Sequence, residues 1–137
     1  MQKKTQKFNK SYTFLLFLRH QTEHGMEIRV KYLEDASEFM LTIDRGASLK
    51  LAYNIAKVSM GVKDSDIFKK LGDTDIWEFR ARHGGNCYRL LSFWDNEAKS
   101  LVIATHGFVK KSEKTPKREI AKAEAIRKNY MENRKDY

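Results

Sequence analysis

The chain of 137 residues carries 27 Lys and Arg against 18 Asp and Glu, a formal net charge of +9. This length suits one domain, and the positive balance favours a polyanionic partner over an acidic small molecule. A single cysteine excludes a disulfide framework, four histidines lack metal-binding spacing, and the longest early apolar run is too short to span a bilayer. We therefore expect a cytoplasmic protein with no membrane partner and no metal or other cofactor.

The excess positive charge lies at the two ends of the chain. Residues 1–25 hold five Lys and Arg against one Glu, residues 26–106 hold twelve against twelve, and residues 107–137 hold ten against five. A regular pattern begins only at Met26, so we interpret residues 1–25 as a basic N-terminal extension and residues 26–137 as the domain. The extension either results from translation starting at Met1 rather than Met26, or is an added element that pairs with the sheet.

The domain opens with a strand and two helices. Residues 27–33, EIRVKYL, alternate in the manner of a half-buried strand. Asp35 begins a sequence that resembles a capping box, which predicts a first helix over residues 35–44. Gly46 is expected to interrupt the pattern, and a second helix is predicted over residues 47–60. Together the helices form a helical hairpin whose apolar stripe needs a sheet to cover.

Three strands and a helix follow a connector at residues 61–74. The strands DIWEFRAR, CYRLLSFW and AKSLVIATHGF are separated by short polar turns. Thr115 is then expected to cap a last helix whose first turn holds Pro116. This order predicts an α+β fold: an antiparallel sheet with an N-terminal helical hairpin on one face and a C-terminal helix.

The most informative segment is residues 101–116, LVIATHGFVKKSEKTP, in which an apolar strand runs into Gly107 and then into a group of cations. Lys110, Lys111 and Lys114 lie within five positions of one another. Ammonium groups on one loop beside a helix N-terminus are suited to holding a phosphate. The alternative is a solvated lysine loop at the edge of the sheet.

Two arginines flank the glycine turn of the middle hairpin. Arg80 and Arg89 face each other if the register is even, and their guanidinium groups then lie close enough to share one phosphate. Glu78 and Arg82 alternate onto the same face as Arg80. Because opposed arginines repel, the pair predicts either acidic neighbours or an anionic ligand. The alternative for each arginine is an exposed cation paired with Glu78.

Aromatic and titratable side chains accompany these cations. Tyr88, Phe93 and Trp94 either stack on the bases of a single strand or belong to the core. His106 ends an apolar strand and is the best-placed group that titrates near neutral pH. A lone histidine is more often structural, so both roles stay open.

The runs IWEFRARHGGNCYRLLSFW and LVIATHGFVKKSEKTPKREIAKA resemble the phage-derived branch of RelE/HigB-like toxins of bacterial type II toxin–antitoxin systems. The most specific part is HGFVKKSEKTPKREI, and the resemblance covers about Met26 to Tyr130. It implies a small RelE-like fold and a metal-independent endoribonuclease that cleaves mRNA, commonly on the ribosome. It also implies a neighbouring antitoxin, often a helix-turn-helix DNA-binding protein.

The resemblance further implies roles for single residues. Arg80 and Arg89 match basic strand positions, with Arg89 at the scissile phosphate, and Lys110 and Lys111 match a basic loop that binds phosphate or protonates the leaving group. Glu78 stands where some members carry a base, so it either accepts the 2′ proton or pairs with Arg80. No Tyr or His follows Lys111, which makes His106 the substitute acid or base. The catalytic set is thus Arg89, Arg80, Lys111, His106 and Glu78, and the RNA-binding set is Arg82, Lys110, Lys114 and Tyr88.

Two other functions compete with RNA cleavage. One is a non-catalytic ParE-like toxin that blocks a topoisomerase by protein contact and needs no phosphate-cleaving groups. The other is an accessory protein that binds RNA or DNA only through counterion release at its basic ends.

Overall fold

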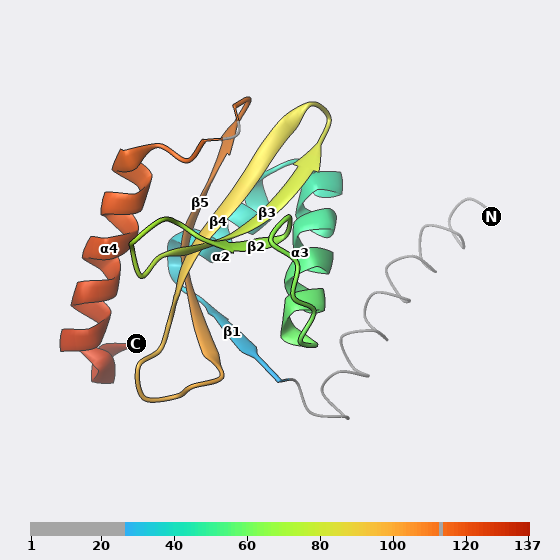
Figure 1. Cartoon of the computed structure of the whole chain (residues 1–137). Helices are drawn as coiled ribbons and strands as arrows, with labels where there is room; N and C mark the ends of the chain where they lie inside the picture. Colours follow the sequence, from blue (N-terminus) through green and yellow to red (C-terminus); the bar gives the residue numbers. More distant parts are fainter. Residues whose placement is uncertain (1–26, 113) are drawn as a thin grey trace.

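A five-stranded sheet forms the centre of the fold, with the strand order β1-β5-β4-β3-β2 (Figure 1). The computed structural model describes residues 27–112 and 114–137, so the predicted extension at residues 1–25 lies outside the described residues. The strands are β1 (Arg29–Tyr32), β2 (Phe68–Lys70), β3 (Trp77–His83), β4 (Asn86–Trp94) and β5 (Leu101–Lys110).

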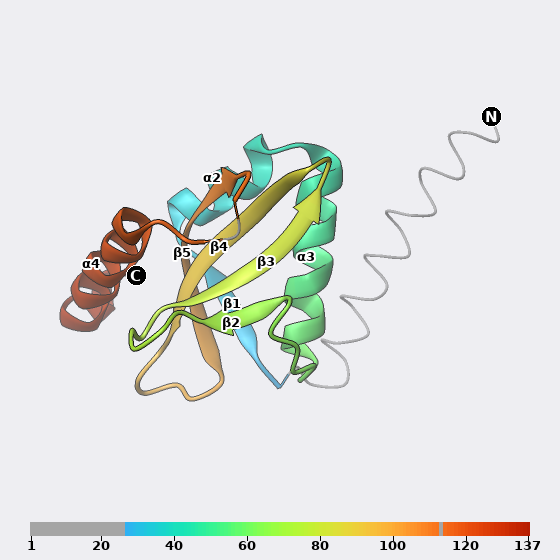
Figure 2. The ribbon, with the colours of Figure 1, turned by 45° about the horizontal axis from the view of Figure 1, so that its top comes forward.

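Helices cover both faces of this sheet. Helices α2 (Glu34–Thr42) and α3 (Arg45–Ser59) pack on one face, and α4 (Lys117–Glu132) packs on the other, followed by the short 3-10 helix η1 (Arg134–Asp136) (Figures 1 and 2). The predicted α+β class, the helical hairpin and the C-terminal helix are therefore confirmed. No helix in the described ranges is long and apolar enough to cross a membrane.

Two apolar cores result, one on each side of the sheet. The core under α2 and α3 includes Ala36, Leu51, Ile55, Phe79, Leu90 and Val102. The core under α4 includes Ile76, Leu91, Phe93, Ile103, Ala123 and Tyr130. Alternation along the strands divides these side chains between the two faces, as period-two patterning requires.

The sheet differs from the prediction in two ways. First, β1 pairs parallel to β5, so the sheet is mixed rather than wholly antiparallel. The chain passes over one face as α2 and α3 before it returns, and such a crossover permits parallel pairing. Second, the predicted connector contains β2, whose three residues pair antiparallel with β3. A strand this short leaves no alternation for a sequence pattern to detect.

The helix starts also differ from the prediction. The capping box at Asp35 is wrong, because α2 begins one residue earlier and no side chain among the described residues caps it. Gly46 does not interrupt a helix but lies within α3, where Asp44 accepts a hydrogen bond from the Ala47 backbone N–H at 3.2 Å. Thr115 is not a cap either, since Pro116 holds that position and the Thr115 hydroxyl is used elsewhere.

A β-bulge in β5 determines which side chains reach the α4 face. Leu91 pairs with His106, but the next residue of β4, Ser92, pairs with Ala104, so Thr105 is the extra residue. Ala104 packs under α2 and α3, whereas Phe108, four residues later, packs on the α4 side. Residues four positions apart lie on one face wherever alternation is unbroken, so the bulge is the reason that these two lie on opposite faces. The bulge therefore places the side chains of His106, Phe108 and Lys110 on the α4 face of the sheet.

Helix α4 is fixed to the rest of the molecule at both ends. At its C-terminal end the Tyr130 hydroxyl donates to Asp95 at 2.6 Å, and Arg134 also contacts that carboxylate. Burial acts to raise the pKa of Asp95, but hydrogen bonds from Tyr130, the Ala98 backbone and Arg134 together hold it well below its usual range. At the N-terminal end the Thr115 hydroxyl donates to Glu78 of β3 at 2.5 Å.

Candidate functional site

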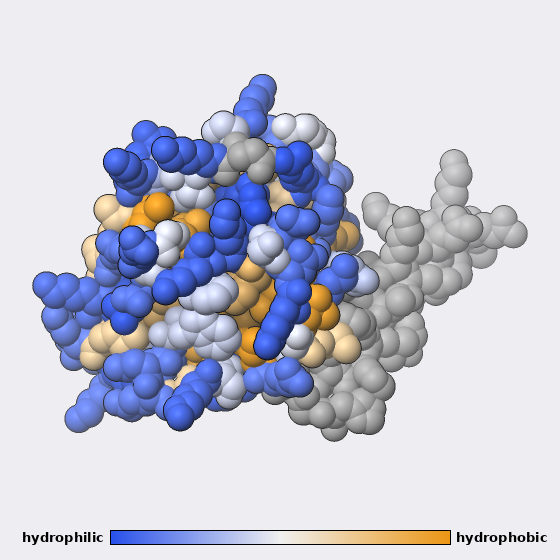
Figure 3. Space-filling view, viewed as in Figure 1, coloured by the Kyte–Doolittle hydropathy of each residue, from blue (hydrophilic) through white to orange (hydrophobic). Residues whose placement is uncertain are grey.

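The α4 helix covers only part of its face of the sheet, and the remainder carries charged side chains. Arg80 lies directly opposite Arg89 in the β3–β4 register, which confirms the predicted even register. Lys110 pairs with Cys87, two residues from Arg89, and so lies on the same face. On the side of the molecule seen in Figure 1, hydrophilic side chains predominate and border apolar patches (Figure 3).

Glu78 lies at the centre of this charged group. Its side chain is buried, with Arg80 Nε at 3.4 Å and Arg89 Nε at 3.5 Å from Oε1. The Thr115 hydroxyl donates to the other oxygen at 2.5 Å. The acidic neighbour expected for two opposed arginines is therefore Glu78. The arginine pair is not an exposed one, however, because Arg89 is only 1% exposed.

Positive charge exceeds negative charge in this group, which we call the cation cluster: Arg80, Arg89 and Lys110 around Glu78. Within residues 27–112 and 114–137, Arg89 Nη2 and Lys110 Nζ are buried atoms without a hydrogen-bond partner. Lys110 Nζ lies 5.9 Å from the centre of the Phe108 ring. Buried donors without acceptors are costly, and they mark a place where an anion would be stabilised.

The pKa values of Lys110 and Arg89 reflect the burial and the crowding of positive charge in the cluster. Burial lowers the pKa of Lys110 below its ordinary value, and the neighbouring charge of Arg89 lowers it further. Burial likewise lowers the pKa of Arg89, with Arg80 as the next cause. The carboxylate of Glu78 acts in the opposite direction on both but does not cancel these effects.

The other predicted cations are distributed around the cluster rather than within it. Lys114 is exposed and lies with Arg80 and Glu78 along a groove beside α4. Lys111 and Arg82 line a separate hollow at the tip of the β3–β4 hairpin. The single lysine loop expected from the sequence is thus divided, because β5 extends to Lys110 and only the later lysines belong to the loop.

Two predicted site residues are buried and are not accessible at the charged part of the sheet. Tyr88 is buried in the core under α2 and α3, on the opposite side of the sheet, so it cannot stack on a ligand held by the cluster. His106 is on the cluster's face but is 3% exposed beneath α4. Its Nε2 lies 3.7 Å from Glu119, and burial followed by the charge of Lys122 lowers its pKa. These placements favour a structural role for both residues.

The structure adds residues that the sequence did not indicate. Thr115 was expected to cap α4 but binds Glu78 instead. Lys69 and Lys70 reach the groove because β2 pairs with β3 beside Glu78. Only the register of β2 brings these lysines to the site, and β2 itself gave no detectable pattern.

The described residues contain no group of three or more His, Cys, Asp and Glu side chains that could hold a metal ion. The side chains gathered here are instead donors and cations, which suit an anion. In chemical terms the site can bind a phosphate through guanidinium and ammonium groups and can donate a proton from a lysine.

The fold and this face define a small α+β domain with a cationic, partly buried sheet surface. The model of one family, described as phage-derived protein Gp49-like (DUF891), matches residues 38–128, and the chain belongs to that family. The family is of the RelE toxin-like kind, in agreement with the general class expected from the sequence. A comparison with curated proteins gave no match.

Proposed function

We propose that the protein is the toxin of a type II toxin–antitoxin system and a metal-independent endoribonuclease that cleaves mRNA. The observation that supports this most is the cation cluster, in which three cations share one carboxylate. Membership of a RelE toxin-like family supports the toxin class. An RNA phosphate would bring the missing negative charge to the cluster.

The chemistry is attack of a ribose 2′-hydroxyl on the adjacent phosphorus. As the bond from O2′ to phosphorus forms, the 2′ proton passes to solvent water. The bond from phosphorus to O5′ then breaks, and a 2′,3′-cyclic phosphate and a 5′-hydroxyl result. Arg80 and Arg89 stabilise the charge that develops on the phosphate oxygens. Lys110 protonates the leaving O5′, because its lowered pKa makes its ammonium a stronger acid than an ordinary lysine.

Glu78 is better suited to holding the cluster than to accepting the 2′ proton. One of its oxygens faces two guanidinium groups and the other accepts from Thr115, so both are occupied. A carboxylate in this position sets the orientation of Arg80 and Arg89. In the cell we expect translating mRNA as the substrate and a helix-turn-helix antitoxin as the partner that silences the toxin.

Replacing Lys110 with Met tests this function. Met has a similar length without the charge, so the fold should be retained while mRNA cleavage falls by about a hundredfold, a loss typical of removing a proton donor. The measurement is the integrity of a reporter transcript in a translating extract, with the exposed Lys99→Met as matched control. Unchanged cleavage by Lys110→Met would exclude the proposed role of Lys110.

A second variant separates cleavage from a ParE-like action. Arg89→Lys keeps a buried cation but loses the guanidinium group, so this variant should cleave mRNA poorly. It should still fold and should bind the antitoxin as wild type does. If wild-type protein leaves all transcripts intact yet still arrests growth through a topoisomerase, the nuclease proposal fails. If it only binds RNA with a steep salt dependence, the accessory-protein alternative is favoured.

A further inference from the structure

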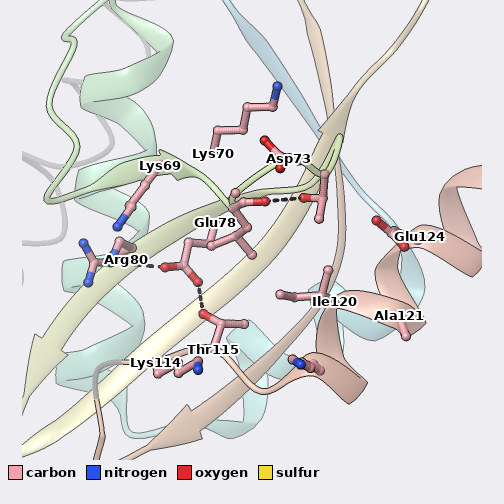
Figure 4. A pocket seen from close by; sticks show the side chains of 14 residues that line it. Lys69, Lys70, Asp73, Glu78, Arg80, Lys114, Thr115, Ile120, Ala121 and Glu124 are labelled. Atoms are coloured by element: carbon pink, nitrogen blue, oxygen red, sulfur yellow. Dashed lines mark hydrogen bonds and ion pairs between the residues drawn. The ribbon is translucent and has the colours of Figure 1, made fainter.

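A groove of about 500 Å³ runs beside the cation cluster, and its residues other than Glu78 and Arg80 have no role in the chemistry described above (Figure 4). One wall is β2 with the turn that follows it, residues 69–74, and the other is the start of α4. Glu78, Arg80 and Thr115 line the end that meets the cluster. Its volume lies within the range of about 300–1,000 Å³ found for small-molecule sites. We call this feature the α4 groove.

Both walls of the α4 groove are held in place by hydrogen bonds. In the turn, Leu71 N donates to Ile76 O at 2.9 Å and the Thr74 hydroxyl donates to Leu71 O at 2.6 Å. On the other side, the bond from Thr115 to Glu78 anchors the residue that precedes Pro116 and α4. The groove therefore exists before any ligand binds, which reduces the ordering cost of binding.

The lining combines positive charge with an apolar surface. Its five cations are Lys69, Lys70, Arg80, Lys114 and Lys117, and its three carboxylates are Asp73, Glu78 and Glu124. Leu71, Ile120 and Ala121 provide apolar surface between them. Glu78 is already engaged by the cluster, so the groove presents an excess of cations to a ligand. No side chain from the described part of the chain caps α4, whose N-terminal dipole adds to that potential.

We propose that the α4 groove binds a nucleotide of a single-stranded RNA that lies next to, but outside, the pair joined by the cleaved linkage. This inference rests on the proposed function, which places the scissile phosphate at the cluster. A nucleotide has a flat, largely apolar base and an anionic phosphate, and the lining of the groove combines apolar side chains with four lysines. The net positive lining and the direct continuity with Arg80 favour RNA over a protein segment as the occupant.

The test uses full-length protein and fluorescent 2′-O-methyl RNA, which binds but cannot be cleaved. Two probes are compared by anisotropy or competition, a dinucleotide and an oligonucleotide of about ten residues, since single-strand sites span several nucleotides. Ala121→Trp fills the groove, and Ala125→Trp, exposed on the same helix but outside the lining, is its control. Lys117→Glu reverses a rim charge, and Lys128→Glu is the matched control on α4.

Wild type should bind the longer probe more tightly than the dinucleotide. Ala121→Trp and Lys117→Glu should weaken the longer probe by about tenfold, which corresponds to about 1.4 kcal/mol for the contacts of one nucleotide, and leave the dinucleotide unchanged. The two controls should bind both probes like wild type. Because the probes cannot be cleaved, these measurements do not depend on nuclease activity. If the protein binds the probes as expected but cleaves no transcript, only the proposed function is contradicted.

Two results would overturn the groove assignment. One is equal affinity of wild type and Ala121→Trp for the longer probe, with the variant folded by circular dichroism. The other is loss of antitoxin binding in Ala121→Trp with RNA binding intact, which would make the groove a protein-docking surface.

Discussion

At the scale of single residues, Lys110 is the clearest case in which the site acts against stability. Its ammonium nitrogen is buried without a hydrogen-bond partner in the described residues, and its nearest charges include Arg89. Burying a charged donor in this way costs free energy that packing does not return. A protein under selection for stability alone would place an apolar residue here, so the lysine indicates a functional demand.

The lowered pKa of Lys110 predicts how stability depends on pH. The unfolded chain keeps this proton up to about its ordinary pKa of 10.5, whereas the folded chain releases it at lower pH. Stability attributable to this group therefore rises with pH between the lowered pKa and 10.5. Urea unfolding should show Lys110→Met more stable than wild type near neutral pH, with the difference shrinking toward alkaline pH. A constant difference would contradict this account.

Glu78 is the residue whose loss should be most costly. Replacing it with Gln removes the single negative charge from among Arg80, Arg89 and Lys110 and leaves buried cations uncompensated. Breaking a buried ion pair from one side costs about 3–5 kcal/mol, and we expect a loss of that order in the free energy of unfolding. The control is Glu97→Gln in the exposed β4–β5 turn, for which chemical denaturation should detect little change.

At the scale of elements, the packing of α2 on β5 depends on one glycine. A Cβ built on Gly107 would lie 2.2 Å from the Phe39 ring, so the helix approaches the strand only because this side chain is absent. Gly107 thus lies within β5, in agreement with the predicted strand AKSLVIATHGF, at a close contact that requires the absence of a side chain.

Gly107→Ala should accordingly destabilise the protein by about 1–3 kcal/mol, the usual cost of overpacking a core contact. Shortening the opposing side chain should relieve the clash, so Phe39→Leu in the same chain should recover part of that loss. A double-mutant cycle of unfolding free energies measures the coupling. Simple additivity of the two single changes would show that the predicted clash is not the cause.

The sequence was sufficient for elements with strong periodicity. The C-terminal helix and the register that opposes Arg80 to Arg89 both agree with the patterns. The sequence was insufficient where tertiary contacts determine the local structure. The strand β2 exists only through pairing with β3, and the face reached by Lys110 depends on a bulge whose position alternation alone does not specify. Thr115 was likewise assigned from local rules, although its partner is 37 residues away.

At the scale of the whole molecule, α4 divides one face of the sheet into a packed half and a charged half. The packed half holds the second apolar core, and the charged half holds the cation cluster, with Thr115 and Glu78 at their boundary. A net charge of +9 adds a general repulsion to this local one. Anions weaken both kinds of repulsion, but only the repulsion within the cation cluster calls for an anion bound at a specific site.

This difference predicts a specific effect of divalent anions on thermal stability. Sulfate bound at the cluster stabilises the folded chain by mass action, in addition to screening and to the exclusion of sulfate from any protein surface. The difference in melting temperature between sodium sulfate and sodium chloride of equal ionic strength therefore contains a general part and a part specific to the site. That difference should be smaller for Lys110→Met than for wild type and unchanged for Lys99→Met, and an equal difference in all three proteins would argue against an anion site.

The extra residue Thr105 also affects how the charged surface around Lys110 tolerates insertions and deletions in β5 during evolution. Loss of the Thr105 codon would leave Ala104 opposite Ser92 and His106 opposite Leu91, so the ladder would become regular and Lys110 would keep its face. An additional codon between His106 and Lys110 would instead shift the end of the strand by one residue and place Val109 opposite Cys87, where Lys110 now lies. A gain in length beyond the bulge is thus a more drastic genetic event for this surface than a loss at the bulge itself.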